Sequence, residues 1–250
     1  MCAINYLWFD QDNTLYDYHE AVHRALNVCL EMIHERFPST GVVLDTAELA
    51  RVRAEITPLA RREGMDLVEA RCEAFRRTLD RYAKPDDGLA SALSDAYFAN
   101  LCKGIRPFPE VTEALVALAD EGYVLGVLSN GICYLEELGL AHLFEHRIYA
   151  NDVLVYKPEA AIFDRALALT GARPEECLLV GDSCACDVIG ARDAGWTGVW
   201  VNRDGCRWES DAEAPDHVME SLADLPPLIT ALNANSDTRG EQPSDEAEEF

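Results

Sequence analysis

Short, continuously apolar segments alternate with helical segments from residue 104 onward, and this alternation restricts the fold more than any other feature of the sequence. The expected strands are Tyr123–Ser129, Cys177–Asp182 and Thr197–Val201, and the expected helices are Glu110–Asp120, Pro158–Leu169 and Cys184–Ala194. Helical crossovers between strands favour a parallel sheet with helices on both faces. Strands buried on both faces are apolar throughout, as these are. We therefore predict an α/β fold whose core is a doubly wound parallel sheet.

The first hundred residues add one more strand and a separate helical segment. Ile4–Phe9 is strand-like and ends in the acidic segment Asp10-Gln11-Asp12. From Tyr18 to Lys103 apolar residues recur every three or four positions, which indicates roughly four helices, and Pro58 should kink or shorten the second. Residues 233–250 are mostly polar and acidic, which is typical of a disordered tail. We expect a core of residues 1–17 and 104–232, a helical cap of residues 18–103, and a disordered acidic tail of residues 233–250.

The charge of the chain narrows the classes of partner. The formal net charge is −24, and only three of the 21 basic residues are lysines. Nucleic acids and anionic membranes favour proteins of the opposite charge, so we expect neither as a partner. A high-salt cytoplasm and a bias in base composition would explain the scarcity of lysine equally well. The chain has no apolar run of the roughly 18 to 20 residues that span a membrane, and the N-terminus does not resemble a signal peptide, so we expect a cytoplasmic protein.

Polar residues gather where the expected strands end. Asp10 and Asp12 follow the first strand, Ser129 and Asn130 end the second, and Asp182 ends the strand that begins at Cys177. The carboxyl ends of parallel strands meet at one edge of the sheet, which is where the active site of such a sheet lies. Two further residues belong to loops at the same edge, namely Lys157 and Asp187.

Phosphoryl transfer is the chemistry that needs such a group of residues. Carboxylates bind Mg²⁺, which neutralises phosphate charge, and a carboxylate can attack phosphorus to form an aspartyl-phosphate. Residues two apart in an extended chain point the same way, so Asp10 and Asp12 can act on one substrate as nucleophile and general acid. Ser129 and the Asn130 region can then hydrogen-bond phosphoryl oxygens, and Lys157 can offset the negative charge.

Four segments in this order resemble the motifs of the haloacid dehalogenase superfamily. The segments are Phe9–Leu15 (FDQDNTL), Val127–Gly131 (VLSNG), Lys157-Pro158 and Val180–Asp187 (VGDSCACD). The resemblance covers residues 1 to 232, and the helical insertion is similar to the cap that this superfamily places between its first and second motifs. It implies a Rossmann-like core with a helical cap domain.

The resemblance also implies a role for each matching residue. Asp10 would be the nucleophile and a metal ligand, and Asp12 the general acid and base, with its backbone carbonyl on Mg²⁺. Asp182 would be a metal ligand, and Asp187 would support the metal or Lys157. Ser129 and Asn130 would bind the substrate phosphate, and Lys157 would steady both the nucleophile and that phosphate.

Several readings remain open within this resemblance. Dehalogenases of the superfamily lack a carboxylate two residues after the nucleophile, so Asp12 favours a phosphatase acting on a small phosphorylated metabolite, such as a nucleoside monophosphate or a sugar phosphate. A phosphomutase or phosphotransferase would use the same residues, and a non-catalytic binding protein could retain the fold. The segment Ile132–Leu138 is shorter than in family members, which predicts a short helix after Asn130.

Basic side chains of the insertion offer two further candidates. His19 and His23 lie at i and i+4, a spacing that can bind a metal, but no third ligand accompanies them. Four arginines could grip an anionic substrate, although a solvated helix face is the favoured interpretation: Arg61, Arg62, Arg76 and Arg77.

Overall fold

The structure is a computed structural model that describes residues 3–39, 44–208 and 211–239, without the side chains of Arg61 and of residues 235–239. The chain divides into two compact units. One contains residues 1–17 and the chain from residue 106 onward, and the other is the helical unit Tyr18–Ile105. The second boundary therefore falls two residues after the one that we expected from the sequence.

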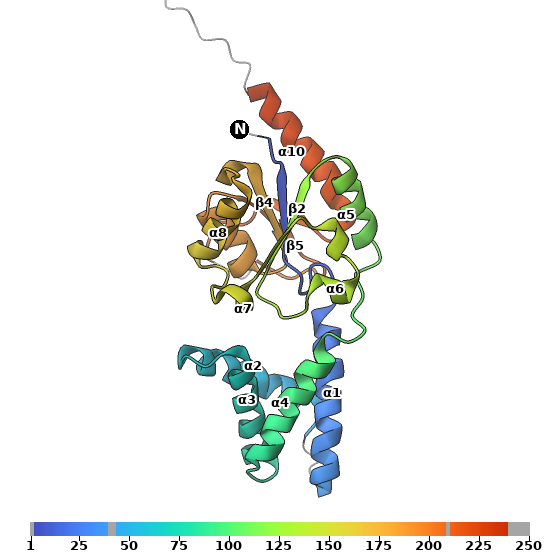
Figure 1. Cartoon of the computed structure of the whole chain (residues 1–250), viewed down its shortest axis with the longest axis vertical. Helices are drawn as coiled ribbons and strands as arrows, with labels where there is room; N and C mark the ends of the chain where they lie inside the picture. Colours follow the sequence, from blue (N-terminus) through green and yellow to red (C-terminus); the bar gives the residue numbers. More distant parts are fainter. Residues whose placement is uncertain (1–2, 40–43, 209–210, 240–250) are drawn as a thin grey trace, which may run out of the picture. The chain divides into compact units, whose positions relative to one another are not determined.

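A parallel sheet forms the centre of the first unit (Figure 1). Six strands in the described residues pair in the order β3-β2-β1-β4-β5-β6, and every neighbouring pair is parallel. The strands are β1 (Tyr6–Phe9), β2 (Val124–Ser129), β3 (His146–Tyr149), β4 (Cys177–Gly181), β5 (Thr197–Val201) and β6 (His217–Met219). The predicted α/β fold with a doubly wound parallel sheet is confirmed.

Helices cover both faces of this sheet. The helix α8 (Ala160–Thr170) lies on one face, and α5 (Val111–Asp120) and α10 (Leu225–Arg239) lie on the other (Figure 1). The helix expected at Cys184–Ala194 consists of a π-helical turn, η4 (Cys184–Ile189), followed by α9 (Gly190–Asp193). The shorter segments are α6 (Leu135–Leu138), α7 (Ala150–Val153), η2 (Ala141–Leu143), η3 (Pro174–Glu176) and η5 (Leu222–Asp224). The four residues of α6 agree with the short helix expected after Asn130.

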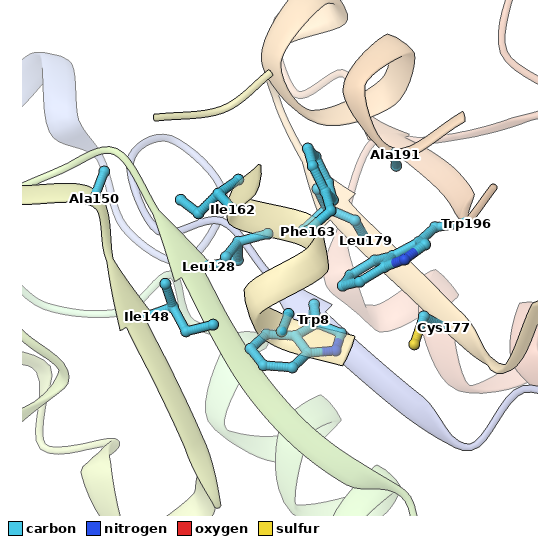
Figure 2. Packing of buried hydrophobic residues seen from close by; sticks show 11 residues of the cluster. Trp8, Leu128, Ile148, Ala150, Ile162, Phe163, Cys177, Leu179, Ala191 and Trp196 are labelled. Carbon is cyan, nitrogen blue, oxygen red and sulfur yellow. The ribbon is translucent and has the colours of Figure 1, made fainter. Parts of the chain in front are cut away.

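A buried apolar cluster packs α8 against the sheet (Figure 2). Trp8, Leu128 and Leu179 come from three adjacent strands and meet Phe163 of α8. Trp8 requires a glycine on the neighbouring strand, because a Cβ at Gly126 would lie 2.6 Å from its ring. The alternate residues of each strand face the opposite helix layer. Burial on both faces thus explains why these strands are apolar throughout.

The C-terminal helix α10 continues beyond the point where we expected a tail. It runs through Asn233 to Arg239, whereas the sequence boundary lay between residues 232 and 233. The Asn233 side chain accepts a hydrogen bond from the Ile4 amide at 2.8 Å and donates one to the Ile4 carbonyl at 3.1 Å. Residues 233–239 are therefore helical rather than part of a disordered tail, and residues 240–250 of the expected tail lie outside the described residues.

The helical unit consists of α1 (Tyr18–Arg36), α2 (Thr46–Arg62), α3 (Leu67–Tyr82) and α4 (Asp87–Leu101). Asp66 accepts from the Glu69 amide and the Glu69 side chain accepts from the Asp66 amide, a capping box that explains where α3 begins. Pro58 lies inside α2, which continues to Arg62. Among the described residues, no helix combines the length and the apolar character needed to cross a membrane.

Candidate active site

The nucleophile candidate Asp10 follows β1 at the carboxyl edge of the sheet. Its amide donates to the Val180 carbonyl at 2.9 Å, which ties the end of β1 to β4. Asp182 follows β4 directly, so the two aspartates leave adjacent strands together. Carboxylate oxygens of Asp10, Asp182 and Asp187 all lie within 4.8 Å of one another. The three carboxylates that we expected at one edge are therefore a real cluster.

Lys157 bridges two of these carboxylates. Its Nζ donates to Asp10 Oδ1 at 2.8 Å and to Asp187 Oδ1 at 2.6 Å, and all three side chains are buried. Burial by itself lowers the pKa of Lys157, but the Asp10 and Asp187 carboxylates outweigh it and raise the pKa. Burial raises the pKa of Asp10 well above its usual value, and Lys157 opposes that rise. The ammonium group therefore partly balances a buried cluster of negative charge.

Asp187 is fixed by the turn that precedes it. Its Oδ2 accepts a hydrogen bond from the Ser183 amide at 2.9 Å, while its Oδ1 accepts from Lys157. A Cβ on Gly181 would lie 2.3 Å from the Asp187 carboxyl carbon, so the absence of a side chain at position 181 makes room for this carboxylate. Both Asp187 oxygens thus accept hydrogen bonds within the protein. Of the two roles predicted for Asp187, this agrees best with positioning Lys157.

Asp182 is half-buried, whereas Asp10 and Asp187 are buried. Asn13 Nδ2 donates to Asp182 Oδ2 at 3.3 Å, and the Trp200 indole donates to the Asp182 backbone carbonyl at 2.9 Å. Burial, followed by the nearby Asp187 charge, raises the pKa of Asp182 to about 6. Asn13 reaches this position from a left-handed backbone conformation, with φ of 57°, which asparagine tolerates better than most residues.

A tyrosine hydroxyl orients the Asp12 carboxylate. The Tyr16 hydroxyl donates to Asp12 Oδ1 at 2.5 Å, and the Tyr16 side chain is buried. A Cβ on Gly131 would lie 2.8 Å from Asp12 Oδ2, so glycine at this position leaves space for the carboxylate beside the loop after β2. The loops after β1 and β2 therefore meet at Asp12.

Ser129 and Asn130 end β2 in different roles. The buried Ser129 Oγ accepts a hydrogen bond from the Gly131 amide at 3.0 Å. Asn130 donates through Nδ2 to the Lys157 carbonyl at 3.0 Å and accepts through Oδ1 from the Lys157 amide at 2.9 Å. The Asn130 side chain thus holds the backbone of Lys157. The predicted binding of substrate phosphate by Ser129 and Asn130 stays a prediction.

Sequence reasoning missed the residues that orient the carboxylates. Tyr16 and Asn13 each donate a hydrogen bond to a carboxylate, Gly181 leaves space for one, and Trp200 holds the backbone of Asp182. The positive φ of Asn13 and the bare Cα of Gly181 depend on the local turns, and Trp200 comes from β5. The segment Asp12–Tyr16 did contain a signal, because a tyrosine four residues from an acid at a strand end can fold back onto it.

The donor set fits a magnesium ion. Carboxylate oxygens are the ligands that Mg²⁺ prefers. Within the described residues, one carboxylate oxygen of Asp10 and one of Asp182 accept no hydrogen bond. Asp12 would contribute its backbone carbonyl and Asp187 a further lone pair, in line with the expected set Asp10, Asp12, Asp182 and Asp187. Without a cation, three neighbouring carboxylates are balanced by the single ammonium of Lys157.

The basic candidates of the helical unit do not form such a cluster. His23 Nδ1 hydrogen-bonds Asn27 Nδ2 at 3.1 Å, and among the described residues neither His19 nor His23 belongs to a group able to hold a metal. Arg76 and Arg77 both pair with Glu73, as expected of a solvated helix face. The side chain of Arg61 lies outside the described residues.

Comparison with known proteins places these features in a family. The family model for haloacid dehalogenase-like hydrolases matches residues 4–195. A glyceraldehyde 3-phosphate phosphatase of Methanothermobacter thermautotrophicus is 30% identical over 211 residues, which covers 82% of this chain and 88% of that protein. An (S)-2-haloacid dehalogenase of Pseudomonas sp. strain YL is 30% identical over 222 residues, covering 86% and 89%.

A solved structure agrees with the sequence comparisons. The crystal structure of a 2-haloacid dehalogenase from Pseudomonas syringae pv. tomato superposes with a TM-score of 0.72 at 28% identity, and the match covers 92% of this chain and 99% of that one. Phosphatases and dehalogenases are thus both among the relatives, so the choice between the two reactions depends on the residues of the site.

Proposed function

The chain belongs to the haloacid dehalogenase-like hydrolases, and we propose that it is a Mg²⁺-dependent phosphatase acting on a small phosphorylated metabolite. The main support for this proposal is the position of Asp12. Its carboxylate lies two residues after Asp10, is oriented by the Tyr16 hydroxyl and fits against Gly131, where a side chain would clash with it. A phosphate ester needs a proton donor for its leaving oxygen, whereas a departing halide needs none. A carboxyl group in this position therefore favours phosphate ester hydrolysis over dehalogenation.

The proposed reaction has two steps. An Asp10 carboxylate oxygen attacks phosphorus, the bond from phosphorus to the ester oxygen breaks, and the Asp12 carboxyl gives its proton to that oxygen. Asp12, now ionised, takes a proton from a water molecule that attacks the aspartyl-phosphate, which releases inorganic phosphate and restores Asp10. Lys157 holds the attacking carboxylate through its 2.8 Å contact and offsets charge on the phosphoryl oxygens. Ser129 lies at the end of β2, where a hydroxyl can hydrogen-bond the same oxygens.

A metal ion completes the charge balance in this proposal. Asp10 and Asp182 would hold it together with the Asp12 carbonyl, and Asp187 would support it while it fixes Lys157. Bound Mg²⁺ would neutralise charge on the phosphate and align it with the nucleophile. The glyceraldehyde 3-phosphate phosphatase relative supports a small phosphorylated substrate. The negative charge of −24 supports the absence of nucleic acid and membrane partners.

A substrate panel tests the proposal. Purified protein is assayed with Mg²⁺ for release of inorganic phosphate from nucleoside monophosphates, sugar phosphates and phosphoglycolate, and in parallel for chloride release from 2-chloropropionate. We expect steady phosphate release from at least one phosphate ester and no chloride release. Chloride release without phosphate release would make the protein a dehalogenase. Transfer of phosphate between sugars without its release would indicate a phosphomutase, and no turnover of any kind would indicate a binding protein.

A further inference from the structure

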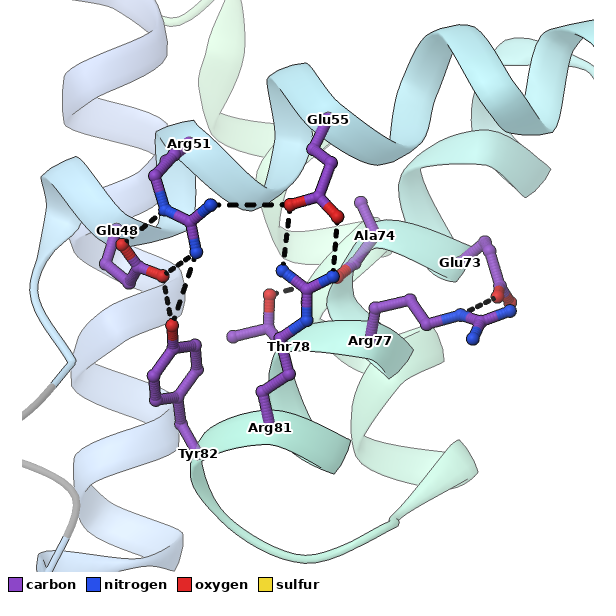
Figure 3. A network of polar contacts seen from close by, with 9 residues as sticks. All are labelled: Glu48, Arg51, Glu55, Glu73, Ala74, Arg77, Thr78, Arg81 and Tyr82. Atoms are coloured by element: carbon purple, nitrogen blue, oxygen red, sulfur yellow. Dashed lines mark hydrogen bonds and ion pairs between the residues drawn. The ribbon is translucent and has the colours of Figure 1, made fainter.

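The arginines labelled in Figure 3 are each paired with a carboxylate. Arg51 contacts Glu48 at 2.5 Å, Arg81 contacts Glu55 at 2.6 Å, and Arg77 contacts Glu73 at 2.6 Å (Figure 3). These pairs are partly exposed to solvent. Such ion pairs are ordinary features of a solvated helix surface.

Arg53 and Arg71 differ from these arginines. Arg53 lies two residues after Arg51 in α2, and a helix turns about 200° over two residues, so Arg53 faces away from the paired surface. Arg71 lies in α3 and is only 4% exposed. In the part of the chain that the structure describes, neither guanidinium has a carboxylate within 4.0 Å. One buried and one half-buried cation of the helical unit thus have no counter-ion among the described residues.

The hydrogen bonds of Arg71 are also incomplete. Among the described residues, its Nη1 reaches only the Thr57 hydroxyl, at 3.4 Å, and its buried Nε has no hydrogen-bond partner. The guanidinium stacks over the Tyr97 ring at 4.5 Å. Burial lowers the pKa of Arg71, and the charge of Arg53 lowers it further. Buried guanidinium groups ordinarily have several hydrogen-bond acceptors, whereas Arg71 has a single long contact with one in the described part of the chain.

Arg53 completes the group from the other side of Tyr97. Its Nη1 lies 3.3 Å from the Tyr97 hydroxyl and 3.4 Å from the Tyr18 hydroxyl, and its buried Nε has no hydrogen-bond partner in the residues that the structure describes. Tyr97 therefore touches both arginines, one through its ring and the other through its oxygen. Arg53, Tyr18 and Thr57 are half-buried, so the group around the buried Arg71 is partly open to solvent.

We propose that Arg53 and Arg71, with the hydroxyls of Tyr18 and Tyr97, form an anion-binding site within the helical unit that takes a carboxylate or phosphate group. An anion would supply the missing counter-charge and would accept hydrogen bonds from the unpaired Nε–H groups. Guanidinium groups suit both anions, because parallel N–H donors match two oxygens of either one. The site shares no residue with the cluster around Asp10, so it goes beyond the proposed function.

Direct binding tests the site without any turnover. The full chain, kept in chelator, is titrated calorimetrically with malonate and with inorganic phosphate, and its melting temperature is followed with each anion. Three variants are compared with it: Arg53→Met, Arg71→Met and, as the matched control, Arg81→Met, whose arginine is paired with Glu55. We expect saturable binding that weakens at least tenfold in the first two variants and stays within about twofold in the control.

The melting temperatures separate a binding role from a structural one. Without anion, replacing an unpaired buried cation by methionine should leave the melting temperature unchanged or raise it. Added anion should raise the melting temperature of the wild type and of Arg81→Met only. Absence of saturable binding in the wild type, or equal binding in all variants, would overturn the proposal. So would a large loss of melting temperature in Arg71→Met without any anion effect in the wild type.

Two substrates identify the source of the anion. 3-Phosphoglycerate and glycerol 3-phosphate differ in a carboxylate at one end. If the anion is part of the substrate, Arg71→Met should lower kcat/KM for 3-phosphoglycerate about tenfold or more and leave glycerol 3-phosphate unchanged. If it is a free anion, malonate should change the rates of both substrates equally in the wild type and not in Arg71→Met. Because binding is measured in chelator, failure of this proposal is distinguishable from failure of the proposed phosphatase function.

Discussion

Replacing Lys157 by methionine should destabilise the metal-free protein strongly. Lys157 is 3% exposed and contacts two carboxylates that are themselves buried, Asp10 at 2.8 Å and Asp187 at 2.6 Å. Removing one partner of a buried ion pair costs about 3 to 5 kcal/mol, because the remaining charge is left without compensation. For a chain of this size, each kcal/mol lowers the melting temperature by roughly 2 to 4 °C, so we expect a fall of roughly 6 to 20 °C.

A surface arginine provides the control. Arg173 contacts Glu175 and Glu176 while 59% of its side chain is exposed, so Arg173→Met should cost about 1 kcal/mol or less. Melting temperatures of wild type, Lys157→Met and Arg173→Met are compared by calorimetry in chelator and in Mg²⁺. The decrease in melting temperature caused by Lys157→Met should be smaller in Mg²⁺, since the cation would neutralise the same carboxylates.

The stability lost in Lys157→Met should depend on pH, and the pKa of Asp10 determines the direction. Burial already holds the pKa of folded Asp10 above its usual 3.8, and loss of Lys157 removes the charge that opposes this rise. A carboxyl group with a raised folded pKa favours folding while protonated, and this contribution is lost as pH rises above 3.8 through the folded pKa. The decrease in melting temperature caused by Lys157→Met should therefore be larger at pH 8 than at pH 5. A loss no greater than that of Arg173→Met at pH 8 would refute the account of the buried cluster.

Further changes should have separate effects. Gly181→Ala places a Cβ 2.3 Å from the Asp187 carboxyl carbon and should cost about 1 to 3 kcal/mol with a clear loss of kcat, unlike Gly88→Ala, whose Cβ has 3.5 Å of space. Asn233→Ala removes hydrogen bonds to both polar backbone groups of Ile4 and should cost about 1 to 3 kcal/mol in denaturant unfolding, and unchanged stability would contradict this. Chelator should abolish turnover, Mg²⁺ should restore it better than Ca²⁺, and equal rates with both ions would argue against an octahedral site. Since the pKa of metal-free Asp182 is about 6, the calorimetric affinity for Mg²⁺ should be weaker at pH 5 than at pH 8, and an affinity independent of pH would contradict its role as a ligand.

The inner strands of the sheet were predictable from the sequence because each is buried on both faces. The segments that became β1, β2, β4 and β5 are almost wholly apolar, and their residues mark the core directly. The strands β3 and β6 escaped prediction because they lie at the sheet edges. Edge strands of three or four residues with histidine or arginine have no comparable pattern.

The active site was likewise predictable only in part. The carboxylates and Lys157 could be placed at one edge because parallel strands deliver their following loops together. The contacts that orient these residues could not be predicted, because Trp200 contacts Asp182 from another strand and Tyr16 contacts Asp12 across a turn. The sequence also directed attention to Arg76 and Arg77, which form surface pairs.

Arg71 illustrates why the helical unit was harder to read. It lies on the buried face of α3 with Ala70, Ala74 and Phe75, and helical periodicity alone could have placed it there. Its lack of a counter-ion, however, depends on which side chains α2 and α4 present to it. That information comes only from the packing of the three helices.

Trapping of the covalent intermediate tests the central claim most directly. An active phosphate ester is mixed with wild type, Asp10→Asn and Asp12→Asn, the reactions are acid-quenched within milliseconds, and phosphorylated peptides are located by mass spectrometry. We expect phosphate on Asp10 in the wild type, accumulation of the same species in Asp12→Asn with a leaving group that departs without a proton, and none in Asp10→Asn. Phosphate on another residue, or turnover by Asp10→Asn, would contradict the assignment of Asp10 as the nucleophile.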